Sequence, residues 1–445
     1  MSKNLVDLSA VEVVGLLRDG KTCPLELLSE VETRHKDTDG KVNALPIICF
    51  EKARVSAQSL MQRSIKNRGV LCGLPVSIKD LSNVAGVATT YGSPIFSKNI
   101  APNNSHVVDN IETSGGVVYA KSNTPEFGAG ASTFNPVFGI TRNPHDLTKS
   151  AAGSSGGAAA SLATGSSWLA HGSDNAGSLR TPASFCGVVG LRPSPGRVPR
   201  GPGAQPYQHL SVDGPMARNV SDAALFLDAM VGEVPEDALS LGVTEASYLS
   251  ASQSGIRPRT VAFSPDLGLT PVDPEVAAVC EGAAKMFERL GVKVRRKAPD
   301  FVGLKEHYRT LRAFNFAVTN GRLLKKNRAL LKPDIIDEFE KGLSLDISKV
   351  IDATRAVAHY RQVAAEFFRE VDVLITPASI VPAFDAELKS VTSCNGVQFE
   401  DYLDWLEIAF VFSFVSLPVL AMPAGYTATG LPIGIQLVSG HRCEA

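Results

Sequence analysis

The chain has 445 residues, of which 44% are hydrophobic and 20% charged, and its formal net charge is −1. This is the composition of a globular protein with a sizeable core. Acidic and basic residues are spread along the whole chain. Because nucleic-acid and membrane-surface binding both need a concentrated basic face, neither role is expected.

The cysteine pattern and the N-terminus bear on the compartment. Seven cysteines are scattered without a CxxC pair or a zinc-binding spacing, which is typical of reduced thiols in a cytosolic protein. The first apolar stretch contains Asp7, Glu12 and Asp19, so it does not have the pattern of a signal peptide. We therefore expect a cytoplasmic protein.

Taken in chain order, the hydrophobic periodicity predicts amphipathic helices at about 8–18, 24–36 and 48–66. A strand in "GLPVSIKD" follows, then a helix and a strand in "SHVVDNIETSGGVVYAKSN", and later strands in "WLAHGSD" and "VDVLITPAS". Strands that alternate with helices predict an α/β fold, an α/β/α arrangement around a mixed, mainly parallel sheet. Ligands in such folds bind beyond the carboxyl ends of the strands.

The stretch 408–440 has no charged side chain, but prolines interrupt it too often for a membrane-spanning helix. Buried strands joined by turns are predicted there instead. No segment has the composition of a true linker, so we expect one domain over 1–445. Its core motifs would lie at 70–230, a variable substrate-pocket region at about 232–370, and buried C-terminal strands at 371–440.

Two short motifs match well-known patterns without their structural context. "GLLRDGKT" at 15–22 fits a phosphate-binding loop, but the apolar face of a helix continues through it and Gly20 looks like a helix stop. "GSSGG" at 153–157 fits the nucleophile elbow of a serine esterase, with Ser155 as nucleophile and His441 as base. The elbow needs a hydrophobic strand before it, whereas "TRNPHDLTKSAA" is polar.

The run "KSAAGSSGGAAAS" at 149–161 has the composition of a flexible linker, yet a strong helix former follows it at once. A helix over about 156–165 extends roughly 15 Å, and the following strand returns roughly 16 Å. Ser154 can therefore lie beside Ser178 in a second loop of small residues. Lys79 ends an apolar strand, and a lysine in a dry site can lose its proton and act as a base.

Several segments together resemble the amidase signature family. They are "GLPVSIKD" (73–80), "KSNTPEFG" (121–128), "GSSGGAAA" (153–160), "GSDNAGSLRTPASFCGVVGLRPSPGRVP" (172–199), "GPMARNVSDAALFLD" (214–228), "VDVLITPAS" (371–379) and "LPVLAMPAGYTATGLPIGIQL" (417–437). The resemblance covers nearly the whole chain and implies the α/β/α fold of that family. Its catalytic lysine, cis-serine and nucleophilic serine correspond to Lys79, Ser154 and Ser178.

The resemblance implies an amidohydrolase of small linear amides that works through an acyl-enzyme. Ser178 would attack the carbonyl, and Ser154, preceded by a cis peptide bond, would pass the proton to a neutral Lys79. Coordinates should show Ser154 Oγ within about 3.2 Å of both Lys79 Nζ and Ser178 Oγ. The backbone N–H groups of Asn175, Ala176, Gly177 and Ser178 would form the oxyanion hole. Gly153, Ser155, Asp174 and Arg180 would support the loops, and no metal or organic cofactor is needed.

Two positions depart from the family pattern. The usual Pro-Gly before Gly153 is Ala151-Ala152, and the usual Gly-Gly-Ser is Ala176-Gly177-Ser178. A methyl group at Ala176 would narrow the oxyanion loop and disfavour a positive φ there.

Several alternatives stay open. An amidotransferase subunit would need a partner enzyme and a cation for the glutamine carboxylate, for which Arg309, Arg312 and Arg322 are candidates. The others are a catalytically silent binding protein of this fold and the Ser155–His441 esterase. The substrate pocket is expected to draw on 120–135, 300–325 and 395–415. The sequence leaves homodimerisation open. Family members usually continue into a last helix, which makes truncation after Ala445 a further alternative.

Overall fold

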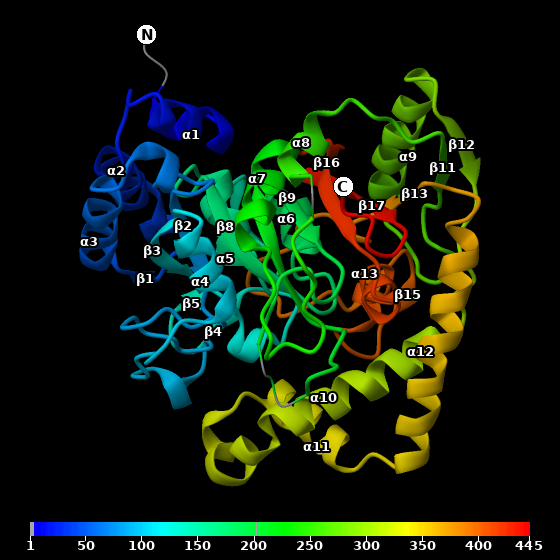
Figure 1. The fold of residues 1–445 in the computed structure, drawn as a ribbon. Coiled ribbons are helices and arrows are strands. Elements are labelled where there is room, and N and C mark those ends of the chain that lie inside the picture. The colour runs from blue at the N-terminus through cyan, green and yellow to red at the C-terminus, as the bar shows by residue number, and fades with distance from the viewer. Residues whose placement is uncertain (1–3, 202, 204, 245) are drawn as a thin grey trace.

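An 11-stranded sheet forms the centre of the computed structural model, which describes residues 4–201, 203, 205–244 and 246–445 (Figure 1). In spatial order its strands are β1 (Ile47–Ile48), β3 (Val117–Ser122), β2 (Pro75–Lys79), β8 (Leu169–Asp174), β10 (Val212–Ala217), β9 (Val189–Arg192), β16 (Val419–Tyr426), β17 (Pro432–Ser439), β13 (Val373–Pro377), β11 (Thr260–Phe263) and β12 (Lys293–Arg296). Three two-stranded sheets lie outside it: β4 (Phe134–Asn135) with β5 (Gly139–Ile140), β6 (Arg142–Asn143) with β7 (Asp146–Ser150), and β14 (Ser393–Cys394) with β15 (Val397–Gln398).

The α/β class and the mixed sheet are confirmed, but the predicted parallel majority is wrong. Four neighbouring strand pairs in the central sheet are parallel and six are antiparallel. The antiparallel pairs include β10, which lies between β8 and β9, and the hairpin of β16 and β17. The alternation of strands and helices predicts crossover connections, which join parallel strands. It does not show which strands pair as antiparallel neighbours, because such pairs need no crossover helix between them.

The helices pack around this sheet (Figure 1). Helices α1, α2 and α3 lie near the β1–β3 side, and α10, α11 and α12 pack together as an outer group. The helices are α1 (Ala10–Arg18), α2 (Pro24–Val42), α3 (Phe50–Met61), α4 (His106–Thr113), α5 (Gly156–Ala163), α6 (Arg180–Cys186), α7 (Val220–Met230), α8 (Tyr248–Gln253), α9 (Pro274–Arg289), α10 (Leu304–Asn327), α11 (Pro333–Leu343), α12 (Ile347–Phe367) and α13 (Glu407–Phe414).

The first helices lie where the periodicity predicts them, but α2 runs several residues further than expected and α3 ends at Met61 rather than near residue 66. A capping box of Ser9 and Glu12 starts α1, as the short polar cap and the following apolar periodicity require. Gly20, which follows this helix, has a φ of 67° and ends it. The phosphate-loop match at 15–22 therefore lies at a helix C-terminus, where the carbonyl groups rather than the N–H groups are free.

The uncharged C-terminal stretch is only partly strand. Strands β16 and β17 lie where buried strands are expected, but residues 407–414 form α13, all of whose residues are buried. The prediction of strands is wrong at this point, because a continuous apolar run does not distinguish a buried helix from a buried strand. Among the helices of the described ranges, none combines the length and the hydropathy needed to cross a membrane.

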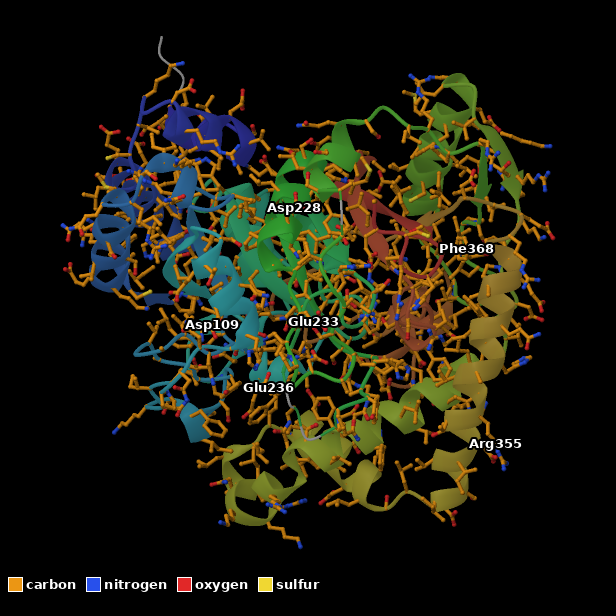
Figure 2. The ribbon with its side chains drawn as sticks, in the orientation of Figure 1. Asp109, Asp228, Glu233, Glu236, Arg355 and Phe368 are labelled. Carbon is orange, nitrogen blue, oxygen red and sulfur yellow. The ribbon has the colours of Figure 1, made fainter. Side chains whose placement is uncertain are left out.

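Two large clusters of buried apolar side chains pack on the sheet. One gathers residues of α1 to α7 with β2, β3 and β8, and the other gathers α9, α12 and α13 with β11, β13, β16 and β17. Charged side chains such as Asp109, Glu233, Glu236 and Arg355 are exposed on the outside (Figure 2). The carboxyl ends of β2 and β8, where Lys79 and Asp174 lie, are completely buried.

Candidate active site

Lys79 is the last residue of β2 and its side chain has no exposed surface. Its Nζ atom lies 2.8 Å from Ser154 Oγ and 2.8 Å from Ser155 Oγ. It also contacts Ser173, with 3.0 Å to Oγ and 3.4 Å to the backbone oxygen. The amine is therefore surrounded by three hydroxyl groups and one carbonyl group.

The Gly153–Ser154 peptide bond is cis, as the family resemblance implies. Ala152, which stands where the family has glycine, has a φ of 56°. This left-handed conformation costs a residue with a side chain about 1–2 kcal/mol. Thr133 holds the turn, because its hydroxyl donates to the Ala152 oxygen at 2.8 Å and accepts from Gly156 N–H at 3.1 Å.

Ser178 lies in the neighbouring loop, between β8 and α6. The Ser155 N–H group donates to the Ser178 oxygen at 3.3 Å, so the two serine loops lie side by side as predicted from helix and strand lengths. The predicted hydrogen bond between Ser154 Oγ and Ser178 Oγ is absent from the described part of the chain. Hydrogen bonds of this kind often close only when substrate is bound.

The backbone of the nucleophile loop corrects the predicted oxyanion hole in one respect. Gly177 N–H donates to Asp174 Oδ1 at 3.1 Å, so this group is already engaged. No such internal acceptor is described for the N–H groups of Asn175, Ala176 and Ser178. The positive φ of the loop, 107°, falls on Gly177, whose missing Cβ would lie 2.7 Å from Ala409 Cβ. Ala176 therefore fits the loop, because its own φ is not positive.

Asp174 holds this loop in place from within the protein. Its carboxylate accepts from the N–H groups of Gly177 and Leu179 and from the Arg180 guanidinium at 2.9 and 3.0 Å. Arg192 donates to both Asp174 Oδ1 and the Asp174 backbone oxygen. Burial raises the pKa of Asp174, but the two guanidinium groups and the backbone donors outweigh this and hold it well below its usual range.

Arg180 is a loop support in this structure. It has no exposed surface, and its remaining donors reach Ala409 O, Gln436 Oε1 and Ser413 Oγ. It thereby ties the nucleophile loop to α13 and β17.

Replacing Asp174 by Asn should destabilise the protein by about 3–5 kcal/mol, because two buried guanidinium groups would lose the carboxylate with which both form ion pairs. Urea unfolding monitored by circular dichroism would measure the loss. Asp352→Asn, at an exposed carboxylate 3.8 Å from Arg355, is the matched control and should change stability by less than about 0.5 kcal/mol. Equal stability of the two variants would contradict the role given to Asp174.

Burial lowers the pKa of Lys79 to about 7, against an opposing effect of Asp213 and Asp174. A lysine with such a pKa is neutral in a large fraction of molecules near neutral pH. A neutral amine has a lone pair that can accept a proton, so this lysine can serve as a general base.

Sequence reasoning missed three residues of the site. Ser173 provides the third hydroxyl group that contacts the Lys79 amine, and Arg192 is the second cation that contacts Asp174. The ring of His171 accepts a hydrogen bond through Nδ1 from the backbone N–H of Lys79, at 3.3 Å. All three lie within or next to the segment 172–199 that carries the family resemblance. The alternation of side chains along β8 could have shown that His171 and Ser173 share a face.

The serine esterase alternative is not supported by the geometry. Ser155 has no exposed surface, and its hydroxyl donates to the Ser173 oxygen at 3.2 Å while it accepts from Lys79. His441 contacts the Ser416 oxygen at 3.3 Å, near the end of the chain. The strand before the motif, β7, is short and mostly polar rather than hydrophobic, and Ser150 is its one buried residue.

Comparisons with known proteins show the family to which the chain belongs. The sequence profile of the family named Amidase matches residues 26–445. The chain is 35% identical to an acylamidase of Rhodococcus erythropolis, over 100% of this chain and 94% of that protein. The chain belongs to the amidase family. It is an enzyme that hydrolyses amide carbon–nitrogen bonds, as its sequence motifs predict.

Two further relatives show the breadth of the family. A glutamyl-tRNA(Gln) amidotransferase subunit from Cyanothece sp. is 30% identical to this amidase, over 93% of this chain and 90% of that protein. The crystal structure of a bacterial aryl acylamidase superposes with a TM-score of 0.91 and 25% identity, covering 98% of this chain and 93% of the other. The fold of the amidase signature enzymes is thereby confirmed.

Two pockets of this amidase are lined by residues that contact the serine loops, although Lys79, Ser154 and Ser178 line neither of them. One of about 220 Å³ is lined by Gly130, Ala131 and Phe134 together with Asp401 and Tyr402, which belong to segments expected to form the substrate pocket. It also draws on residues of α11, from Asp334 to Lys341, which lie outside the segments expected from the sequence. Gly128, in the same loop, approaches the active site closely, since a Cβ there would lie 3.5 Å from Ser154 Oγ.

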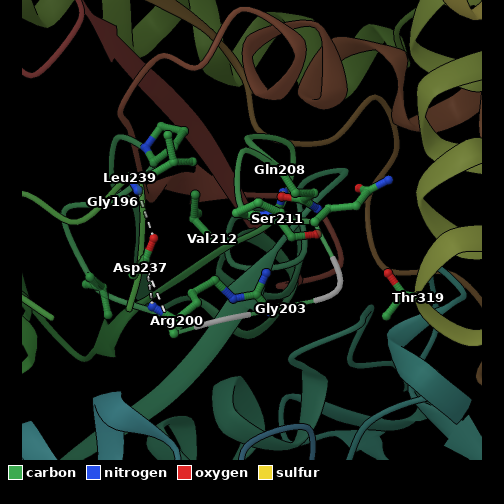
Figure 3. A pocket seen from close by; sticks show the side chains of 14 residues that line it. Gly196, Arg200, Gly203, Gln208, Ser211, Val212, Asp237, Leu239 and Thr319 are labelled. Atoms are coloured by element: carbon green, nitrogen blue, oxygen red, sulfur yellow. Dashed lines mark hydrogen bonds between the residues drawn. The ribbon is translucent and has the colours of Figure 1, made fainter. Parts of the chain in front are cut away.

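The other pocket, of about 210 Å³, lies on the side of β10 (Figure 3). Its wall includes Arg200, Gln208, Ser211 and Thr319. It adjoins the nucleophile loop, because Asn175 Nδ2 donates to Ser211 Oγ at 2.7 Å. Thr319 is the contribution of the predicted segment 300–325.

The cationic candidates for a glutamine carboxylate are mostly engaged. Arg309 makes ion pairs with Asp401 at 2.7 Å and Asp404 at 2.8 Å. Arg312 is buried between Glu338, at 3.5 Å, and the Tyr402 hydroxyl. Arg322 is exposed on α10. Arg309 and Arg312 are therefore already paired with carboxylates of the protein itself.

Proposed function

We propose that this amidase cleaves small linear amides through an acyl-enzyme, with Ser178 as nucleophile, Ser154 as proton relay and Lys79 as general base. The observation that carries the proposal is the 2.8 Å contact between Lys79 Nζ and Ser154 Oγ in a site without solvent exposure. Ser178 is 9% exposed and is thus the most accessible of the three. Substrate can therefore reach Ser178 while the Lys79 amine remains shielded from water.

The proton would move along the three residues in order. Neutral Lys79 donates its two N–H groups toward Ser155 and Ser173 and accepts the Ser154 hydroxyl hydrogen with its lone pair. As Ser178 Oγ attacks the amide carbonyl, its proton passes to Ser154 while Ser154 gives its own to Lys79. The reverse transfer protonates the leaving nitrogen, the carbon–nitrogen bond breaks, and the acyl group stays on Ser178. Water then attacks the ester by the same relay and releases the acid.

The oxyanion that forms at each attack would be stabilised by the nucleophile loop. We assign this role to the N–H groups of Asn175, Ala176 and Ser178, while Gly177 N–H keeps Asp174 in place. Each such donor contributes about 3 kcal/mol to the transition state. The Asn175 side chain is held between Tyr308 and Ser211, at 2.7 Å from each, which limits movement of the loop.

Hydrolysis is favoured over an amidotransferase role. The acylamidase relative is more similar to this chain than the amidotransferase relative is, at 35% against 30% identity. A glutamine carboxylate would have to displace Asp401 or Glu338 from their arginines. We therefore propose acyl amides, including anilides, as the substrate class. The seven cysteines are free thiols, which supports a reducing compartment and hence the cytoplasm.

A panel of aliphatic amides, anilides, peptide amides and ureas tests this proposal, with glutamine and a chelator as additions. We expect acid and amine to be released from acyl amides or anilides, and no change in rate with either addition. The released amine or ammonia would be quantified directly. Ammonia release from glutamine, at a rate exceeding that of every acyl amide, would instead identify an amidotransferase subunit.

A further inference from the structure

Three strands place a chain of polar side chains behind Lys79. The register of β2 against β8 pairs Val76 with Leu169 and Ser77 with Ala170. At Lys79 the acceptor is a side chain of β8 instead of a backbone carbonyl. The backbone N–H of Lys79 donates to His171 Nδ1 at 3.3 Å. His171 has no exposed surface. The end of β2, and with it the position of Lys79, thus depends on this side chain.

The hydrogen bond to Lys79 also determines which nitrogen of His171 carries the proton. A neutral imidazole that accepts through Nδ1 carries its hydrogen on Nε2. That Nε2 atom is buried and makes no hydrogen bond among the described residues, and it lies 3.6 Å from Asp213 Oδ1 on the neighbouring strand β10. Asp213 is 4% exposed and pairs in register with Ser173, the residue whose hydroxyl contacts Lys79 Nζ. One buried carboxylate therefore faces both the histidine and the end of β8.

The second oxygen of Asp213 connects this chain to a pocket. Arg200 Nε donates to Asp213 Oδ2 at 3.1 Å, and the Arg200 side chain is 44% exposed. Arg200 lines the 210 Å³ pocket, where its backbone N–H donates to Asp237 at 2.8 Å (Figure 3). The contacts run from Lys79 through His171 and Asp213 to a cation at the protein surface.

We propose that Asp213 is a positioning residue for amide hydrolysis, which orients His171 against the end of β2 and, balanced by Arg200, provides the negative charge behind Lys79. This inference rests on the proposed role of Lys79 as the base. It adds a residue on β10 to a site otherwise built from β2, the Ser154 loop and the Ser178 loop.

The other charges around Lys79 are already matched by close partners. Asp174 lies between Arg180 and Arg192, and Asp80, next to Lys79, forms a 2.8 Å ion pair with Lys121. Burial lowers the pKa of Lys79 most, Asp213 opposes it most strongly, Asp174 follows, and Arg200 acts in the direction of burial. Among the described residues, the permanently charged side chain that pairs with Asp213 is the half-exposed Arg200. The charge of Asp213 is therefore the one whose removal should affect Lys79 most.

Two variants should shift the pH dependence in opposite directions. Asp213→Asn keeps the shape and an acceptor for His171 but removes the charge that favours protonated Lys79. Lys79 then stays neutral at lower pH. The acid limb of the profile, which is the fall of kcat/KM as the pH decreases, should therefore shift to lower pH by about one unit. Arg200→Gln removes a positive charge, favours protonated Lys79, and should move the same limb up. A change that only loosened the structure would not produce opposite shifts.

The experiment compares kcat/KM and the rate of fluorophosphonate inactivation across pH for both variants, with Glu236→Gln as the control. Glu236 is exposed at the surface and carries the same charge as Asp213 (Figure 2). Its replacement should leave the limb in place. An unshifted limb in Asp213→Asn, or equal shifts in both variants, would overturn the inference.

Two further outcomes are distinguishable. If Asp213→Asn does not fold, Arg200→Gln alone decides, because its side chain lies at the surface: an upward shift supports the inference and an unshifted limb overturns it. If Lys79→Met retains the wild-type rate, the proposed base itself is wrong, and the inference fails with it.

Discussion

Replacing Ser178 by alanine should reduce kcat by about 10⁴- to 10⁶-fold, because no other group can form the acyl-enzyme. The neighbouring Ser154 and Ser155 are 3% and 0% exposed and both contact Lys79, so neither can take over the attack. Folding should be retained, since within the described residues the Ser178 side chain makes no hydrogen bond that alanine would remove. Steady-state hydrolysis of an anilide or acyl amide measures the loss.

A fluorophosphonate probe locates the nucleophile independently of turnover. Peptide mapping of the labelled protein should place the adduct on Ser178, and labelling should be absent from the Ser178→Ala variant. His441→Ala is the control that should label normally, because the described hydrogen bond of the His441 ring is to the Ser416 oxygen and not to a serine of the site. An adduct on Ser155, or labelling that depends on His441, would restore the esterase alternative.

Lys79→Met should reduce kcat/KM by about 10²- to 10⁴-fold, the usual contribution of a general base. The methionine side chain is of similar length and can fill the same buried space, but its thioether sulfur is not basic enough to take the Ser154 proton. The Lys36→Met variant, at an exposed lysine on α2, is the control and should keep full activity. Thermal melting of both proteins would separate a lost base from a lost fold.

We expect the proposed base, Lys79, to determine the acid side of the wild-type pH profile. Burial lowers the pKa of Lys79 to about 7. Above this pH the Lys79 amine is mostly neutral and can act as a base, and below it the amine is mostly protonated. Activity should therefore fall as the pH decreases through about 7. The limb should be missing in the residual activity of Lys79→Met. A flat wild-type profile between pH 5 and pH 8, roughly the range in which such a group titrates, would contradict the assignment.

Local patterns in the sequence were sufficient for much of the fold and for the identity of the candidate residues. Apolar periodicity located α1 and α3, and a short apolar run ending in a lysine located β2. The small-residue loops around Ser154 and Ser178 could be placed side by side from helix and strand lengths alone. These features depend on neighbours in the chain, and therefore leave a readable signal in it.

The same local reasoning was wrong where distant segments decide the outcome. Alternating helices and strands predicted a mainly parallel sheet, but β10 inserts antiparallel between β8 and β9. The apolar run before β16 was expected to be strand, but it packs as the buried helix α13. The periodicity of the sequence does not determine the order of the strands in the sheet, nor whether a continuous apolar run forms a helix or a strand. Both depend on the part of the protein against which the segment packs.

What the sequence determined by itself was the kind of chemistry: a lysine and two serines in small-residue loops, in a pattern that resembles the amidase signature family. Only the tertiary structure showed that Gly177 N–H is engaged by Asp174 and that Ser173 is a third hydroxyl at Lys79. It also showed that, among the described residues, the Ser154 hydroxyl is hydrogen-bonded to the lysine but not to the Ser178 hydroxyl. It also placed Asp213 behind the base, from a strand more than a hundred residues away along the chain. The physical reason is that hydrogen-bond direction and the charge around a buried amine depend on distances between strands, which are set by sheet register and packing rather than by neighbouring residues.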